Sequence, residues 1–126
     1  MKNEKIPMAK TILVIDDASD VVELLEFKLK KEGYEIVTAG NGVEGLEKIR
    51  LNKPDLILLD IVMPLMDGYT FVQEIKKIKD AANIPIIVVS VKDQMQDLFR
   101  IEGVRDFLVK PFAPDVLMAR VSKYLN

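Results

Sequence analysis

Apolar and polar positions divide this chain into alternating blocks of two kinds. In one kind, apolar residues follow one another almost without interruption and end on a polar side chain. Such short runs, bounded by turn residues, are typical of strands that are buried on both faces of a sheet. We therefore predict five strands, over residues 11–16, 35–39, 55–60, 84–90 and 105–110.

In the other kind of block, apolar residues recur every three or four positions, as they do on one face of a helix. The first helix is expected over Ser19–Glu32, and the fourth is short and ends near Gly103. The apolar positions of the five predicted helices are Val21, Val22, Leu24, Leu25 and Leu29; Val43, Leu46 and Ile49; Phe71, Val72, Ile75 and Ile78; Met95, Leu98 and Phe99; and Val116, Leu117, Val121, Tyr124 and Leu125.

Turn residues separate these blocks. Gly33 is expected to cap the first helix at its C-terminus, because Gly tolerates the left-handed conformation. Asn41 and Gly42 indicate a turn, and residues 63–68 form a loop containing Pro and Gly. Gly45 lies inside the second helix, where it is expected to cost about 0.5–1 kcal/mol relative to Ala.

Five strands that alternate with helices predict an α/β fold with a parallel sheet covered on both faces. For five strands the common doubly wound, flavodoxin-like order is 2-1-3-4-5, which gives a three-layer sandwich. Ligands bind such sheets beyond the C-terminal strand ends, where the winding reverses. Here that point lies between the strands over residues 11–16 and 55–60.

Composition narrows the functional classes. The 126 residues fit one domain, which we place at residues 10–126 after a charged tail over residues 1–9. A net charge of −2 gives no positive field to attract nucleic acid. With no Cys and no His, disulfides, thiolate sites, a histidine nucleophile and imidazole metal ligands are excluded. The chain shows no signal peptide and no membrane-length apolar stretch, so we expect a cytoplasmic protein.

Polar side chains suited to metal binding or catalysis stand at the predicted strand ends, namely Asp16, Asp17, Asp60, Ser90 and Lys110. A parallel sheet brings these ends to one edge. Two unit charges ~4 Å apart repel by about 4 kcal/mol at an effective dielectric of 20. Protons or a cation must relieve this repulsion. Oxygen ligands alone favour Mg²⁺ or Mn²⁺, and a carboxylate can act as a nucleophile that forms an aspartyl phosphate. Lys110 would neutralise phosphoryl charge and Ser90 would donate a hydrogen bond to it.

Each of these residues also has a purely structural interpretation. Asp17 and Ser19 would serve as caps of the first helix, and Asp60 would serve as a turn residue. Ser90 and Lys110 would be ordinary polar ends of strands. The coincidence of all of them at matching strand ends favours the chemical interpretation.

The motifs ILVIDDASD, PDLILLDIVMPLMDG, PIIVVS and DFLVKPF occur in this order in the chain. Because of these motifs, residues 10–126 resemble the CheY-like receiver domain of two-component response regulators. The resemblance implies that Asp60 is the phosphoacceptor. It further implies that Asp16, Asp17 and Asp60 hold Mg²⁺, directly or through water, together with the backbone carbonyl of Val62.

The resemblance also implies the parts of a switch. Ser90 would be the switch hydroxyl, Phe107 the switch aromatic and Lys110 the phosphoryl-binding lysine. The bond between Lys110 and Pro111 would be cis, an isomer that is found essentially only before proline.

The function implied is transfer of a phosphoryl group to Asp60 from a phosphohistidine on a sensor histidine kinase or a histidine phosphotransfer protein. Such a domain is a signalling switch that catalyses only its own phosphorylation and dephosphorylation, rather than an enzyme with a separate substrate. Phosphorylation would remodel the surface formed by the helix near residues 95–103, the last strand and the closing helix. The output partner and the oligomeric state, monomer or phosphorylation-linked dimer, stay open.

Two positions depart from the pattern of the family. Val91 follows the switch hydroxyl, at a position where the family usually has a small residue. A branched side chain there is expected to slow phosphorylation by small phosphodonors and hydrolysis of the phosphoryl group. Ser90 and Lys110 are 20 positions apart, about two fewer than expected. The helix between them would therefore be shortened, which bears on switching and on partner choice.

Three rival functions share parts of this pattern. A degenerate receiver would bind partners without phosphorylation, but the acidic set is intact. An aspartate-nucleophile phosphatase would resemble D-x-D at the first strand, where this chain has Asp16-Asp17-Ala18. A flavodoxin-like carrier would need a phosphate loop rich in Ser, Thr and Gly after the first strand, which is missing here.

Overall fold

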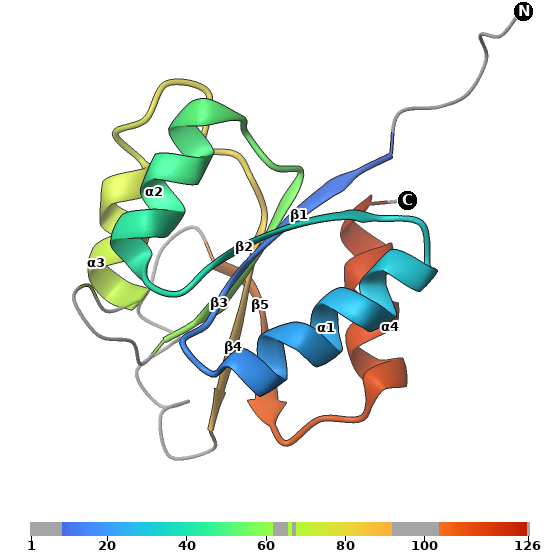
Figure 1. Cartoon of the computed structure of the whole chain (residues 1–126). Helices are drawn as coiled ribbons and strands as arrows, with labels where there is room; N and C mark the ends of the chain where they lie inside the picture. Colours follow the sequence, from blue (N-terminus) through green and yellow to red (C-terminus); the bar gives the residue numbers. More distant parts are fainter. Residues whose placement is uncertain (1–8, 62–65, 67, 92–103, 126) are drawn as a thin grey trace, which may run out of the picture.

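The computed structural model describes residues 9–61, 66, 68–91 and 104–125 (Figure 1). Its elements are β1 (Thr11–Ile15), α1 (Ser19–Lys31), β2 (Glu35–Ala39), α2 (Gly42–Leu51), β3 (Leu56–Asp60), α3 (Gly68–Ile75), β4 (Ile86–Val91), β5 (Val104–Lys110) and α4 (Pro114–Leu125). The short helix expected near residues 95–103 and all but the last residue of the expected tail lie outside the described residues. The α4 of this numbering is the closing helix of the sequence analysis.

The five strands form one parallel sheet in the order β2-β1-β3-β4-β5, which confirms the predicted doubly wound topology. In Figure 1, α1 and α4 cover one face of the sheet, and α2 and α3 cover the other. The result is the expected three-layer α/β sandwich. The C-terminal ends of β1 and β3 are neighbours, as the position of the site requires.

Side chains that alternate along the strands build two separate cores. From β1, Leu13 and Ile15 belong to the cluster that contains residues of α2 and α3, and Phe71 is the largest fully buried side chain. Ile12 and Val14 belong to the cluster on the face of α1 and α4. This alternation, with period two, explains why the central strands read as continuous apolar runs.

Three apolar residues that were expected on buried helix faces are exposed instead. Leu24 is 52% exposed, Val43 is 43% exposed and Val116 is 41% exposed. In α1 the fully buried positions are Leu25 and Leu29, which are one helical turn apart. Leu24, the residue before Leu25, therefore points away from the sheet, although its apolar character had suggested burial.

Several predicted boundaries also shift by a few residues. β1 ends at Ile15 rather than at residue 16, and β4 runs from residue 86 to 91 instead of 84 to 90. Pro85 has no N–H to give to a ladder, and its carbonyl accepts from Ile57 just before β4 begins. α3 ends at Ile75, so Ile78 lies in the following turn, where it still packs against the core.

A helix end and a close helix–strand contact explain why glycine stands at positions 33 and 45. Gly33 has a φ of 96°, and its N–H donates to the carbonyl of Lys30 while that of Tyr34 donates to Leu29, which confirms the predicted cap as a Schellman motif. Gly45 lies where α2 touches the sheet. A Cβ at this position would be 2.6 Å from Ile15 Cδ1, so Gly permits the close packing of α2 on β1.

The helix that follows β2 also covers part of that edge strand. Asn41 caps α2 by accepting from the N–H of Glu44 at 2.9 Å. One turn further along α2, Lys48 Nζ donates to the carbonyl of Thr38 at 3.0 Å. A charged side chain thus reaches back over the outer edge of the sheet.

Candidate functional site

The sheet brings three carboxylates together at the ends of β1 and β3. Asp16 and Asp17 directly follow β1, and Asp60 is the last residue of β3. One carboxylate oxygen from each lies within 4.8 Å of the other two. Asp16 is 5% exposed and the Asp60 side chain is 12% exposed, whereas Asp17 is exposed. The sequence correctly predicted this cluster although 44 positions separate Asp16 from Asp60.

Lys110, at the end of β5, places its amine within this cluster. Its Nζ donates to Asp16 Oδ2 at 2.9 Å and to Asp60 Oδ2 at 3.5 Å. Burial acts to lower the pKa of Lys110, but hydrogen bonds and charges from Asp16 and then Asp60 outweigh it, so this pKa lies above its ordinary value. The peptide bond between Lys110 and Pro111 is cis, as expected.

Asp16 is fixed in place by its own loop. Its N–H donates to the carbonyl of Ala39, and its Oδ1 accepts from the N–H of Ala18 at 2.9 Å. Ala18 is itself the N-cap of α1, and no side chain caps this helix end. Capping by Asp17 or Ser19, the structural interpretation, is therefore wrong, and Asp17 keeps its carboxylate for the cluster.

The remaining predicted residues have different outcomes. Ser90 is 2% exposed near the end of β4, one residue beyond Val89, which is the ladder partner of Asp60. Phe107 lies in β5 and packs, partly buried, against the core on the side of α2 and α3. Val62, whose carbonyl was expected to bind the metal, lies outside the described residues.

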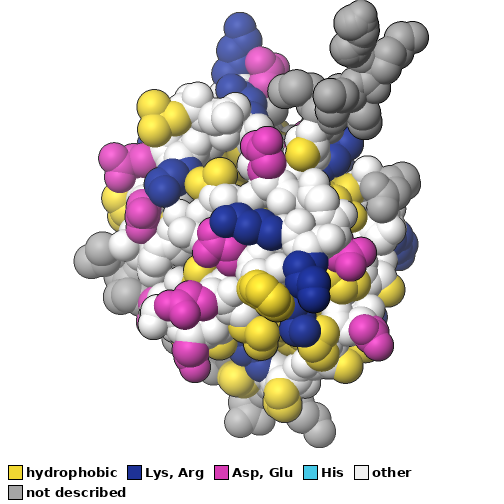
Figure 2. Space-filling model, turned by 45° about the vertical axis from the view of Figure 1, so that its right-hand side comes forward, with side chains coloured by type: hydrophobic (Ala, Val, Ile, Leu, Met, Phe, Trp, Pro, Cys, Tyr) yellow, Lys and Arg dark blue, Asp and Glu magenta, His cyan; other side chains and the backbone are white. Residues whose placement is uncertain are grey.

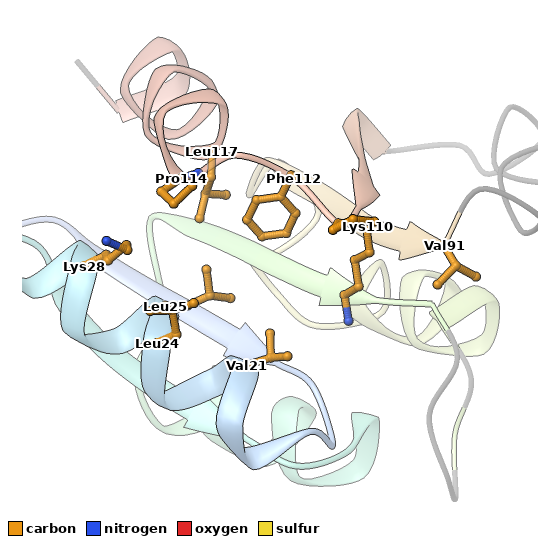
Figure 3. Close-up of a pocket in the computed structure, with 10 residues that line it drawn as sticks. Val21, Leu24, Leu25, Lys28, Val91, Lys110, Phe112, Pro114 and Leu117 are labelled. Atoms are coloured by element: carbon orange, nitrogen blue, oxygen red, sulfur yellow. The ribbon is translucent and has the colours of Figure 1, made fainter.

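An apolar groove of about 400 Å³ runs beside the site, between α1 and the start of α4. Figure 3 shows Val21, Leu24 and Leu25 on one side of it and Phe112 and Leu117 on the other. Lys110 and Val91 also line it. Figure 2 shows hydrophobic and basic side chains lying together on the face of the molecule that it presents.

Val91 lines the same groove as Lys110 and is 48% exposed. A second hollow, also of about 400 Å³, opens on the other side of Asp16 and has an acidic lining that includes Glu23, Glu26 and Glu44. The site thus has one apolar flank and one acidic flank.

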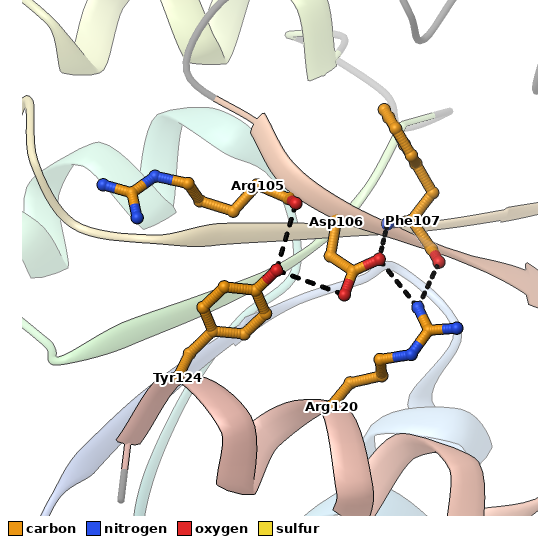
Figure 4. A network of polar contacts seen from close by, with 5 residues as sticks. All are labelled: Arg105, Asp106, Phe107, Arg120 and Tyr124. Carbon is orange, nitrogen blue, oxygen red and sulfur yellow. Dashed lines mark hydrogen bonds and ion pairs between the residues drawn. The ribbon is translucent and has the colours of Figure 1, made fainter.

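Sequence reasoning missed a polar cluster on β5 and α4 (Figure 4). Arg120 and Tyr124 both contact Asp106, with Arg120 Nη1 2.7 Å from Asp106 Oδ1 and the Tyr124 hydroxyl 3.2 Å from Oδ2. The one signal in the sequence is the spacing of Arg120 and Tyr124, which puts both on one face of a helix. The periodic pattern identifies Tyr124 only as an apolar position.

None of the helices that the structure describes is long and apolar enough to cross a membrane. Among the described residues, the trio of Asp16, Asp17 and Asp60 is the single group of three acidic side chains close enough to share a metal ion.

Comparison with known proteins identifies similar sequences and folds. Residues 12–122 match the family described as the response regulator receiver domain. The chain is 38% identical over 121 residues to the alkaline phosphatase synthesis transcriptional regulatory protein PhoP of Bacillus subtilis, covering 94% of this chain and 50% of that protein. The chain thus spans about half the length of this relative.

Solved structures agree in fold. A two-component response regulator from Clostridium difficile is 31% identical with a TM-score of 0.84, covering 92% of this chain and 95% of that one. The receiver domain of the sensor histidine kinase PA1611 from Pseudomonas aeruginosa is 24% identical with a TM-score of 0.85, covering 93% of this chain and 98% of that one. That structure is described with a magnesium ion coordinated in its active-site cleft.

Proposed function

The chain belongs to the response regulator receiver domain family, and from this premise we propose that Asp60 is its phosphoacceptor. Receiver domains of this family are signalling switches that interact with histidine kinases. The observation that carries the proposal is the meeting of Asp60 with Asp16, Asp17 and the Lys110 amine. We propose a phosphohistidine of a sensor histidine kinase or of a histidine phosphotransfer protein as the donor.

The carboxylates fit a small divalent cation. Their oxygens lie within 4.8 Å of one another, and hard oxygen donors suit Mg²⁺ or Mn²⁺. Asp16, Asp17 and Asp60 would hold the ion, and by the family resemblance the carbonyl of Val62 would add a fourth ligand. When bound, such an ion supplies positive charge that stabilises negative charge developing on a transferred phosphoryl group.

In the proposed transfer, an oxygen of Asp60 attacks phosphorus and the P–N bond of the donor phosphohistidine breaks. The electron pair stays on the imidazole nitrogen, which then takes a proton. Lys110 already lies 3.5 Å from Asp60 Oδ2, so its charge is in place to neutralise phosphoryl oxygen. After transfer, the Ser90 hydroxyl would donate a hydrogen bond to the phosphoryl group.

These new contacts would bias a two-state switch. Moving a population from 1:99 to 99:1 needs about 5.5 kcal/mol of differential stabilisation. Hydrogen bonds to charged groups contribute about 1.5–3 kcal/mol each, so a few of them suffice. We propose that Phe107 follows the movement of Ser90 and that the output surface comprises the helix expected near residues 95–103, β5 and α4.

We further place the functional unit at residues 10–126 and in the cytoplasm, without nucleic acid or membrane as a partner of this unit. The net charge of −2 supports the first exclusion.

The test is a pair of two-dimensional amide NMR spectra of wild type and Asp60→Ala in Mg²⁺, before and after beryllofluoride, which imitates an aspartyl phosphate. We expect wild-type shifts at Asp60, Ser90 and Lys110 that spread to β5, and none in the variant. Shifts confined to the pocket would indicate binding without relay. An unresponsive wild type would contradict the proposal and favour an interaction module that works without phosphorylation.

A further inference from the structure

Strand β5 lies at the edge of the sheet and is held there by side chains of α4 (Figure 4). Arg120 Nη1 lies 2.7 Å from Asp106 Oδ1 and also donates to the carbonyl of Phe107 at 3.1 Å. The hydroxyl of Tyr124 lies 3.1 Å from the carbonyl of Arg105 and 3.2 Å from Asp106 Oδ2. Three residues of the edge strand, Arg105, Asp106 and Phe107, are thus linked to one helix face by four contacts.

The main chain of Phe107 is bound on both sides by this cluster. Its N–H donates to Asp106 Oδ1 at 2.8 Å, and its carbonyl accepts from Arg120. A single guanidinium nitrogen therefore serves both the carboxylate and the Phe107 carbonyl. Moving Arg120 would release the Phe107 carbonyl, and moving Asp106 would release its N–H and also remove the partner that holds Arg120.

Asp106 is the centre of the cluster because both of its oxygens are engaged. Its side chain is 17% exposed, so contacts with the guanidinium are screened by water less than those of a surface pair. Tyr124 has one proton for two acceptors, and burial together with the charge of Asp106 raises its pKa. The Tyr124 hydroxyl contacts Arg105 and Asp106, and it does not share the bond to Phe107.

Consecutive residues of β5 face opposite layers, which makes the cluster a link across the sheet. Asp106 faces α4, whereas the Phe107 ring packs against the core on the side of α2 and α3. Lys110, which reaches the carboxylates, follows three residues later on the same strand. A restraint on Phe107 is therefore also a restraint close to the phosphoacceptor site.

We propose that Arg120 is a positioning residue that acts through Asp106 and the carbonyl of Phe107. It holds the Phe107 main chain in the arrangement described here and so limits exchange of the aromatic ring between rotamers. This inference rests on the proposed function of Asp60. The restraint opposes the switched state, so weakening it lets a phosphoryl mimic shift the equilibrium more easily.

The test uses Arg120→Gln, which removes the charge, and Arg120→Lys, which keeps it. Tyr124→Phe is the matched control, because it removes a contact to Asp106 from the same helix face but leaves the bond to Phe107. Two quantities are measured for each protein: Phe107 rotamer populations from three-bond NMR couplings without metal, and beryllofluoride affinity at fixed Mg²⁺.

We expect Arg120→Gln to mix the Phe107 rotamers and to raise beryllofluoride affinity about fivefold, the change that one net hydrogen bond supports. Arg120→Lys should restore part of both effects, and Tyr124→Phe should leave both quantities at wild-type values. Wild-type rotamers and affinity in Arg120→Gln would overturn the proposal. Equal changes in Tyr124→Phe would also overturn it, because they would reflect general loosening of the edge.

Two further measurements separate the possible failures. If Arg120→Gln does not fold, Asp106→Asn removes the charge at the same contact without changing the shape of the side chain, and the same two changes are expected from it. If wild type ignores beryllofluoride, the proposed function fails. The rotamer populations in metal-free protein then still decide whether Arg120 positions Phe107.

Discussion

The carboxylate cluster predicts that Asp60, the proposed phosphoacceptor, destabilises the metal-free fold. Asp60 lies within 4.8 Å of Asp16 and Asp17 and 3.5 Å from Lys110 Nζ. At an effective dielectric of about 20, each repulsion is worth about 3.5 kcal/mol and the attraction about 4.7 kcal/mol, which leaves roughly 2 kcal/mol of net repulsion. Because Asp17 is exposed, screening reduces this to about 1–2 kcal/mol.

Asp60→Asn removes this charge and keeps the shape of the side chain. In EDTA we expect the variant to unfold at a Tm roughly 3–8 °C above that of wild type, as followed by circular dichroism. Mg²⁺ at ten times its Kd should stabilise wild type by about 1.4 kcal/mol. The variant has lost one ligand charge and should gain less, so the difference in stability should shrink as Mg²⁺ is added.

Asp55→Asn is the control, because Asp55 accepts the N–H of Thr11 at the opposite end of the strands. This variant should show the same dependence of Tm on Mg²⁺ as wild type. A metal-free Asp60→Asn protein that is less stable than wild type would refute the reasoning. It would mean that the contacts of Asp60 outweigh its repulsion by the other carboxylates.

Gly45→Ala should lower the free energy of unfolding, measured in urea, by about 1–3 kcal/mol, because the new Cβ would lie 2.6 Å from a side-chain carbon of Ile15. Gly40→Ala, whose Cβ would lie 3.7 Å from its nearest neighbour, should be tolerated. A stabilised Gly45→Ala would contradict the packing argument. Val91→Ala should speed both phosphorylation by small phosphodonors and hydrolysis of the product, because it removes a branched side chain that lines the groove together with Lys110. Equal or slower rates in a time-course assay would sink that idea. Because folding raises the pKa of Lys110, the charged amine stabilises the fold fully at pH values below its ordinary pKa of 10.5. This stabilisation is lost as pH rises through the pKa of the folded state. The stability difference between wild type and Lys110→Met in EDTA should therefore narrow above that pH, and a constant difference would argue against the raised pKa.

The sequence was most informative about the sheet and its acidic edge. Five apolar runs predict five strands, and parallel strands must bring Asp16 and Asp60 to the same edge. The positions of Asp17 and Lys110 follow from the same argument, because each stands at a strand end. Strand order and cluster were therefore predictable without knowledge of any contact.

Features that depend on exact helix rotation or on distant polar pairs were not predictable. Leu24 and Leu25 are adjacent and equally apolar, yet only the structure shows which of them faces the sheet. Asp106 and Arg120 belong to different elements, and no local pattern joins them. Gly45 looks unfavourable in a helix until the approach of Ile15 is known.

The two edges of the sheet have a consequence for the behaviour of the protein at high concentration. A parallel sheet can grow only where an incoming strand finds free main-chain groups at an outer strand. On β2 the carbonyl of Thr38 is occupied by Lys48, and on β5 the carbonyls of Arg105 and Phe107 are occupied by Tyr124 and Arg120. The same side chains that fix the helices thus occupy main-chain acceptors on both borders, and they make β5 in particular a poor template for polymerisation between molecules.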